Sequence, residues 1–137
     1  MGAARDLAES FYELLGAGDL EGVRALYADD CITVTPVGPL DNDAHDAMSR
    51  SLRGGFPDGH MEPDHLVEAG DEVMVTGRFK GTHSGDLVSP AGTIPASGNP
   101  LDMRFADYFR VSEGKIVAQE SLFDQMTLLA QIGALGP

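Results

Sequence analysis

The chain has 137 residues, 42% of them hydrophobic, which predicts one folded domain over residues 1–137. Its formal net charge of −13 argues against binding to nucleic acid or to an anionic membrane, because phosphate groups would be repelled. The single cysteine, Cys31, excludes an internal disulfide and a cysteine-based zinc site, and the histidines form no close-spaced ligand pair. We therefore expect no metal and no other cofactor. The chain shows no signal-peptide pattern and no membrane-length apolar run, so we expect a cytoplasmic protein.

The N-terminal part of the sequence predicts three helices. Residues 4–16 carry an apolar stripe at helical spacing, made of Leu7, Phe11, Leu14 and Leu15. Asp19 can cap a second helix with a stripe that runs to Tyr27, and "DNDAHDAMSRSL" predicts a third helix that ends before Gly54. The segment "CITVTP", between the second and third helices, predicts a short strand.

From about residue 60 the hydrophobic period changes to two, which predicts an antiparallel meander. Hairpin turns are expected at Gly70-Asp71 and at Glu113-Gly114, and a loop rich in Pro, Gly and Ser at residues 86–102. Three helices followed by a curved sheet indicate the α+β class, with the helices on one face of the sheet. One end of such a fold would stay open for a ligand.

Strand alternation around the last hairpin predicts acids on the apolar face. If the turn has two residues, the inward set contains Asp107, Glu120 and Asp124, and Asp107 lies opposite Glu120. A bulge would shift this register. On the preceding strand His83 shares the inward face with Gly77 and Gly81, which leave room for strong curvature or for a ligand. An apolar pocket of this kind raises carboxyl pKa values and suits proton transfer.

Several motifs, in order along most of the chain, resemble one family. They are "GDLEGVRALYADDCITVTP", "FPDGH", "GTHSG", "FRVSEGKIV" and "FDQMTLLAQIG". In these the chain resembles the SnoaL-like polyketide cyclases, or ester cyclases, of the NTF2-like superfamily. The resemblance implies a cone-shaped barrel, with three N-terminal helices on a strongly curved, mostly antiparallel sheet. It also implies a deep apolar pocket, chemistry without cofactor or metal, and a homodimer formed through the outer face of the sheet.

The family's catalytic aspartate lies near the end of the last long strand and closes a ring by an intramolecular aldol reaction. The resemblance assigns this role to Asp124, with Asp107 and His83 in support. Several family members carry His where this chain has Asp107. The substrate would be a small apolar molecule bearing carbonyl groups, and the expected binding residues are Glu120, Phe105, Phe109, Leu122, Phe79, Met103, Phe56 and Tyr12.

Other interpretations of these residues stay open from the sequence. Asp124 precedes "QMTLLAQI", which has helical spacing, so it could cap a helix, alone or in addition to catalysis. His83 could be a satisfied half-buried histidine, whereas His45, His60 and His65 are expected at the surface. The protein could also be a ligand-binding relative without catalysis, or a hydrolase or dehydratase that activates water.

Overall fold

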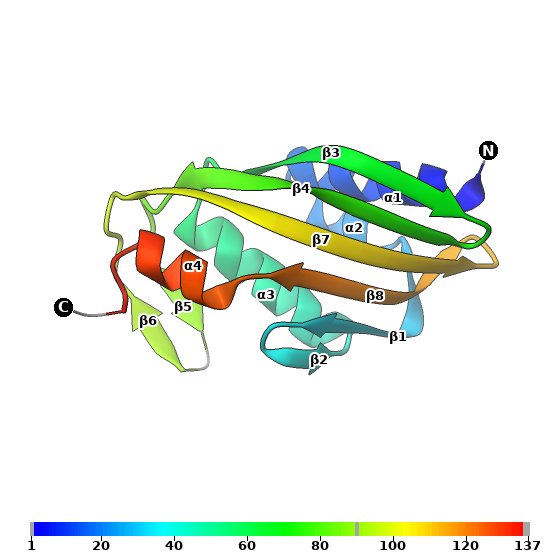
Figure 1. Cartoon of the computed structure of the whole chain (residues 1–137). Helices are drawn as coiled ribbons and strands as arrows, with labels where there is room; N and C mark the ends of the chain where they lie inside the picture. Colours follow the sequence, from blue (N-terminus) through cyan, green and yellow to red (C-terminus); the bar gives the residue numbers. More distant parts are fainter. Residues whose placement is uncertain (1, 90, 136–137) are drawn as a thin grey trace.

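A six-stranded mixed sheet with helices on one face is the main feature of the computed structural model, which describes residues 2–89 and 91–135 (Figure 1). The elements, in chain order, are α1 (Ala3–Gly16), α2 (Leu20–Arg24), β1 (Tyr27–Thr35), β2 (Gly38–Leu40), α3 (Asn42–Gly55), β3 (His60–Ala69), β4 (Glu72–Thr82), β5 (Leu87–Ser89), β6 (Gly92–Ile94), β7 (Pro100–Ser112), β8 (Lys115–Phe123) and α4 (Gln125–Gln131). No helix among the described residues is long and apolar enough to cross a membrane.

The sheet has the strand order β2-β1-β8-β7-β4-β3 and is open, with β2 and β3 at its edges. Strands β1 and β8 run parallel, and the other neighbours pair antiparallel. The predicted α+β class and the mostly antiparallel, curved sheet are confirmed, although the sheet does not close into a barrel. The β5–β6 hairpin and α4 lie together at one end, away from the N-terminus (Figure 1).

Local sequence signals explain the helix boundaries. The Asp19 side chain accepts a hydrogen bond from the Gly22 amide at the start of α2, and Asp41 does the same for Ala44 at the start of α3. Helix α2 is shorter than its apolar stripe predicts because Tyr27 begins β1, where it pairs with Ile116 of β8. The predicted loop at 86–102 contains the β5–β6 hairpin.

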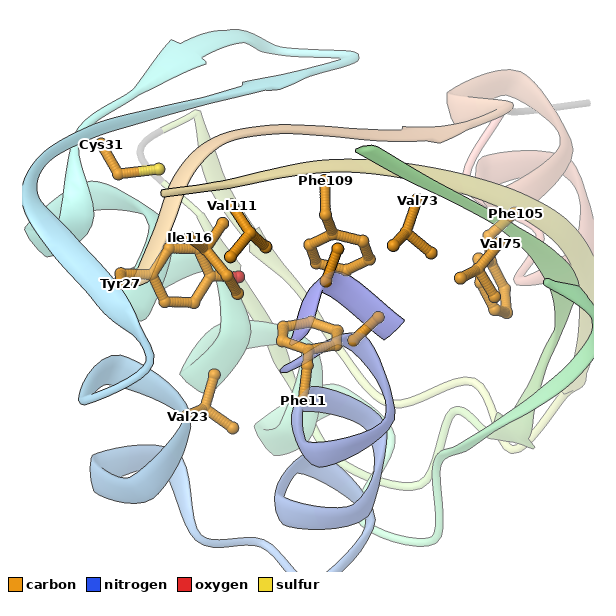
Figure 2. Packing of buried hydrophobic residues seen from close by; sticks show 12 residues of the cluster. Phe11, Val23, Tyr27, Cys31, Val73, Val75, Phe105, Phe109, Val111 and Ile116 are labelled. Atoms are coloured by element: carbon orange, nitrogen blue, oxygen red, sulfur yellow. The ribbon is translucent and has the colours of Figure 1, made fainter. Parts of the chain in front are cut away.

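The main core lies between α1, α2 and the inner face of the sheet (Figure 2). Phe11 of α1 points at the sheet and meets Phe109 of β7 edge-on, with ring centroids 5.3 Å apart. Val73 and Val75 of β4 are fully buried beside them, as the alternation of that strand predicts. The outer face of the sheet leaves Ile32, Val34, Val67, Met74 and Leu122 exposed. The expected homodimer stays a prediction.

The register of the last hairpin differs from the predicted one because β8 contains a bulge. Its turn forms as expected, with positive φ at Glu113 and Gly114. The pairing then shifts between Arg110 and Val111, so that Asp107 lies opposite Ser121 and not opposite Glu120. Because one extra residue reverses the faces of a strand, Glu120 and Leu122 point to the exposed outer face.

Gly77 lies at a second irregularity, where β3 bulges between Pro63 and His65. A methyl group on Gly77 would lie 2.8 Å from Cα of Pro63 and 2.9 Å from the Phe105 ring. The absence of a side chain at Gly77 therefore lets the bent edge strand approach β4 closely. Of the two uses predicted for this glycine, the structure supports curvature of the sheet.

Replacing Gly77 with alanine is expected to lower the free energy of unfolding by about 1–3 kcal/mol, because the new methyl group meets backbone atoms that cannot rotate away. Gly16→Ala is the matched control, since no atom lies within 4 Å of the added methyl group there. Urea unfolding measures both. Equal stabilities of the two variants would contradict this account of the curvature.

Candidate functional site

A pocket lies between the inner face of the sheet and helices α1 and α3. Its cavity volume is about 110 Å³. Most of its wall is apolar, and the lining side chains of this kind are Phe11, Leu15, Met48, Leu52, Phe56, Met61, Phe79, Met103, Phe105 and Phe123. The polar lining groups are Tyr12, His45, Ser49, Arg53, His60, Asp107 and Ser121. A predominantly apolar cavity with a few polar side chains is typical of a small-molecule site.

Asp107 is the only carboxylic acid among these lining residues, and it is almost fully buried. The middle of β7 positions it, and the Tyr12 hydroxyl on α1 donates a hydrogen bond to its Oδ2. Its other oxygen, Oδ1, has no hydrogen-bond partner within the described part of the chain. A buried carboxyl oxygen without a donor is costly, and this cost is largest when the carboxyl is charged.

Burial raises the pKa of Asp107 to about 6, because the apolar surroundings penalise the charged carboxylate. The hydrogen bond from Tyr12 and the neighbouring Ser121 hydroxyl oppose this shift but are outweighed. Burial and the nearby Asp107 charge raise the pKa of Tyr12, which therefore stays a neutral donor. The site thus holds a carboxyl that can gain and lose a proton near neutral pH.

Helix α3 supplies one wall of the pocket, which the sequence interpretation missed. His45, Ser49, Leu52 and Phe56 follow one another at intervals of four, three and four residues and so share one helical face. The prediction that His45 lies at the surface is wrong, because only 9% of this residue is exposed. Its Nδ1 lies 3.4 Å from the Thr33 hydroxyl oxygen. Burial lowers the pKa of His45, so this imidazole is neutral at neutral pH. The helical spacing could have revealed this face in the sequence.

Six of the predicted site residues do line the pocket: Asp107, Tyr12, Phe56, Phe79, Met103 and Phe105. Phe109 lies in the core behind the pocket, in contact with Phe11. Glu120 and Leu122 do not line it, because the β8 bulge turns them outward. The same bulge turns Ser121 and Phe123 inward, and both were missed because the prediction assumed an unbroken register.

His83 is buried as predicted but does not line the pocket or meet Asp107. Its Nδ1 accepts a hydrogen bond from the Ser97 amide at 3.2 Å, and its buried Nε2 has no hydrogen-bond partner within the described residues. Phe56 packs against the imidazole, with ring centroids 5.4 Å apart, and separates it from the pocket. The supporting role that the sequence assigned to His83 has no geometric basis here.

Asp124 caps α4 and lies outside the pocket. Its carboxylate accepts hydrogen bonds from the amides of Met126 and Thr127 and from the Thr127 hydroxyl. These bonds, the one from the Thr127 side chain foremost, lower the pKa of Asp124. The capping interpretation is therefore confirmed. An exposed carboxylate with a lowered pKa is a poor proton carrier at neutral pH, and the position of Asp124 contradicts the expectation that it lies inside the pocket.

Comparisons with known proteins agree with this architecture. A family model described as SnoaL-like polyketide cyclase matches residues 5–132. The chain is similar to IdmH of Streptomyces antibioticus, a candidate polyketide cyclase, with 29% identity, a TM-score of 0.79, and 95% of this chain and 98% of that chain covered.

Two further structures share the fold at lower identity. They are a candidate SnoaL-like polyketide cyclase from Jannaschia sp. CCS1 (18% identity, TM-score 0.84, 98% and 94% covered) and AclR, a candidate hydroxylase from Streptomyces galilaeus (17%, 0.85, 98% and 83%). At these identities the likeness concerns the fold alone. No curated protein sequence matches the chain.

The raised pKa of Asp107 predicts a pH-dependent effect on stability. The native state binds more protons than the unfolded state between pH 4 and 6, so the contribution of Asp107 to the unfolding free energy falls as pH rises through this window. Asp107→Asn removes the titration. We expect the variant to match the wild type below about pH 4 and to exceed it by up to about 3 kcal/mol above pH 6.

Urea unfolding at a series of pH values measures this difference. Asp124→Asn is the control with the opposite sign: because the pKa of Asp124 is lowered, its stabilising contribution is present above pH 4 and fades on acidification. A constant difference between Asp107→Asn and the wild type from pH 4 to 7 would contradict the raised pKa.

Proposed function

Since the chain belongs to the SnoaL-like polyketide cyclase family, and its function is therefore of the cyclase or isomerase kind, we propose that Asp107 is its general acid and base. The observation that carries the proposal is a buried carboxyl, with a pKa near neutrality and one free oxygen, in the wall of an apolar pocket. The substrate is a small apolar molecule with at least two carbonyl groups. Its ring closure is an intramolecular aldol reaction.

The proton transfers follow from the two states of the Asp107 carboxyl. The ionised form takes a proton from a carbon next to one carbonyl, and the resulting enolate attacks the carbon of a second carbonyl in the same molecule. A carbon–carbon bond forms and the second carbonyl oxygen becomes an alkoxide. The protonated Asp107 returns its proton to that oxygen, so the carboxylate is restored and nothing is consumed.

Neighbouring groups support this chemistry by position. Tyr12 fixes the carboxyl through Oδ2 and leaves Oδ1 for the substrate proton. His45 is neutral and can donate a hydrogen bond to a carbonyl oxygen, which lowers the energy of the developing enolate. The apolar wall favours a folded substrate chain and excludes water, so orientation contributes much of the rate. A hydrolase or dehydratase would use the same carboxyl on water, whereas a non-catalytic binder would not need its raised pKa.

The proposal predicts activity on 1-phenylhexane-1,5-dione and longer diketones, whose ring closure can be followed by proton NMR. We expect Asp107→Asn to lower the rate by about 100-fold or more, the range found for loss of general acid–base catalysis. Because the base must be ionised, kcat/KM of the wild type should rise with pH through about 6 and then level off.

Asp124→Asn is the matched control, because it makes the same chemical change at an exposed helix cap. It should leave the rate within about two-fold of the wild type. An unchanged rate in Asp107→Asn, or a large loss in Asp124→Asn, would contradict the proposed role of Asp107.

A further inference from the structure

Arg53 is the one permanently charged cation among the lining residues of the pocket, which the apolar groups otherwise dominate. It lies in the last turn of α3 and is half-buried, whereas Asp107 is almost fully buried. Arg53 is therefore the more solvent-accessible of these two lining groups. A ligand that spans the pocket would meet both groups.

The charge of Arg53 is not neutralised by an acid within residues 2–89 and 91–135. Most other cations of this acidic chain do have a carboxylate partner: Arg5, Arg24, Arg50, Arg78, Lys80 and Arg104. The hydrogen bond that Arg53 makes runs from Nη1 to the backbone carbonyl of Leu15, at a long 3.4 Å. In a chain of net charge −13, a guanidinium in the ligand pocket without an acid partner is available for an anion.

The position of the guanidinium depends on the turn between α1 and α2. A methyl group on Gly18 would lie 3.1 Å from Cζ of Arg53, so the missing side chain at Gly18 makes room for the arginine over this turn. The contact with Leu15 also places the positive charge at the C-terminal end of α1, where the helix dipole favours it. These contacts hold the guanidinium at the pocket edge without using up its donors.

We propose that Arg53 forms a carboxylate-binding subsite at the mouth of the pocket. The ligand then carries a carboxylate at the end opposite its reacting carbonyl group; only this second statement rests on the proposed cyclase function. A planar guanidinium fork matches the two oxygens of a carboxylate. A phosphate group carries more negative charge and would need further cations, whereas His60, another basic group of the pocket lining, is already paired with Glu62 at 2.7 Å.

Two ligands of nearly the same shape test the subsite directly: 1-naphthylacetic acid and its neutral amide, 1-naphthylacetamide. Titration calorimetry at pH 7.5 gives both dissociation constants. We expect the wild type to bind the acid about ten-fold more tightly than the amide, and Arg53→Gln to bind the two equally. Arg50→Gln is the matched control, because Arg50 pairs with Asp46 outside the pocket and its loss should leave the preference for the acid unchanged.

Equal binding of the acid and the amide by the wild type would overturn the proposal, and so would an unchanged preference in Arg53→Gln. If Arg53 only supported α1, its loss would weaken the binding of both ligands alike and leave the ratio of their dissociation constants unchanged. That result would also overturn the proposal. Thermal unfolding shows whether Arg53→Gln is folded; if it is not, Arg53→Lys replaces it and should keep a reduced preference for the acid. The acid-to-amide ratio needs no turnover, so a failed diketone assay would remove the cyclase proposal and leave the subsite standing.

Discussion

The pairing of the Asp107 carboxyl with the Tyr12 hydroxyl is the interaction on which the site depends. It joins α1 to the middle of β7 and fixes a carboxyl inside an apolar cavity. Burial of this acid costs free energy in its charged form, and the same cost raises its pKa to about 6. Burial of Asp107 therefore lowers the stability of the folded protein, and the same burial lets this carboxyl exchange a proton near neutral pH.

The bulge in β8 decides which side chains meet that carboxyl. Without it Glu120 would face Asp107, and two acids at short range would compete for one proton. With it the serine hydroxyl of Ser121 lies opposite, and Phe123 closes the apolar wall. The one-residue bulge thus removes Glu120 from the site and leaves Asp107 as the single carboxylic acid among its described lining residues. The isolated acid is the simpler proton carrier, because no second titration is coupled to its own.

Much of the fold could be predicted from the sequence, and the site only in part. The spacing of the hydrophobic residues predicted the helices, the hairpins and the inward faces of β4 and β7. The burial of Asp107 followed from its place on the inward face of β7. The alternation of side chains along β8 could not locate the bulge, because an unpaired extra residue leaves no trace in the local sequence pattern. Glu120 and Leu122 were therefore assigned to the wrong face of the sheet.

The catalytic role of Asp124 was assigned by motif resemblance, although its sequence context already allowed a helix cap, which the structure confirms. The wall formed by α3 was overlooked because a polar stripe such as His45 and Ser49 resembles a solvated helix face.

The most direct test of the central claim is a carbon-13 NMR titration of the Asp107 carboxyl, with the signal assigned by its loss in Asp107→Asn. The account predicts a pKa of about 6 for this group. A value at or below the roughly 3.9 of a free aspartate would mean a solvated or charge-paired carboxylate, and would contradict both the buried acid and its role in proton transfer.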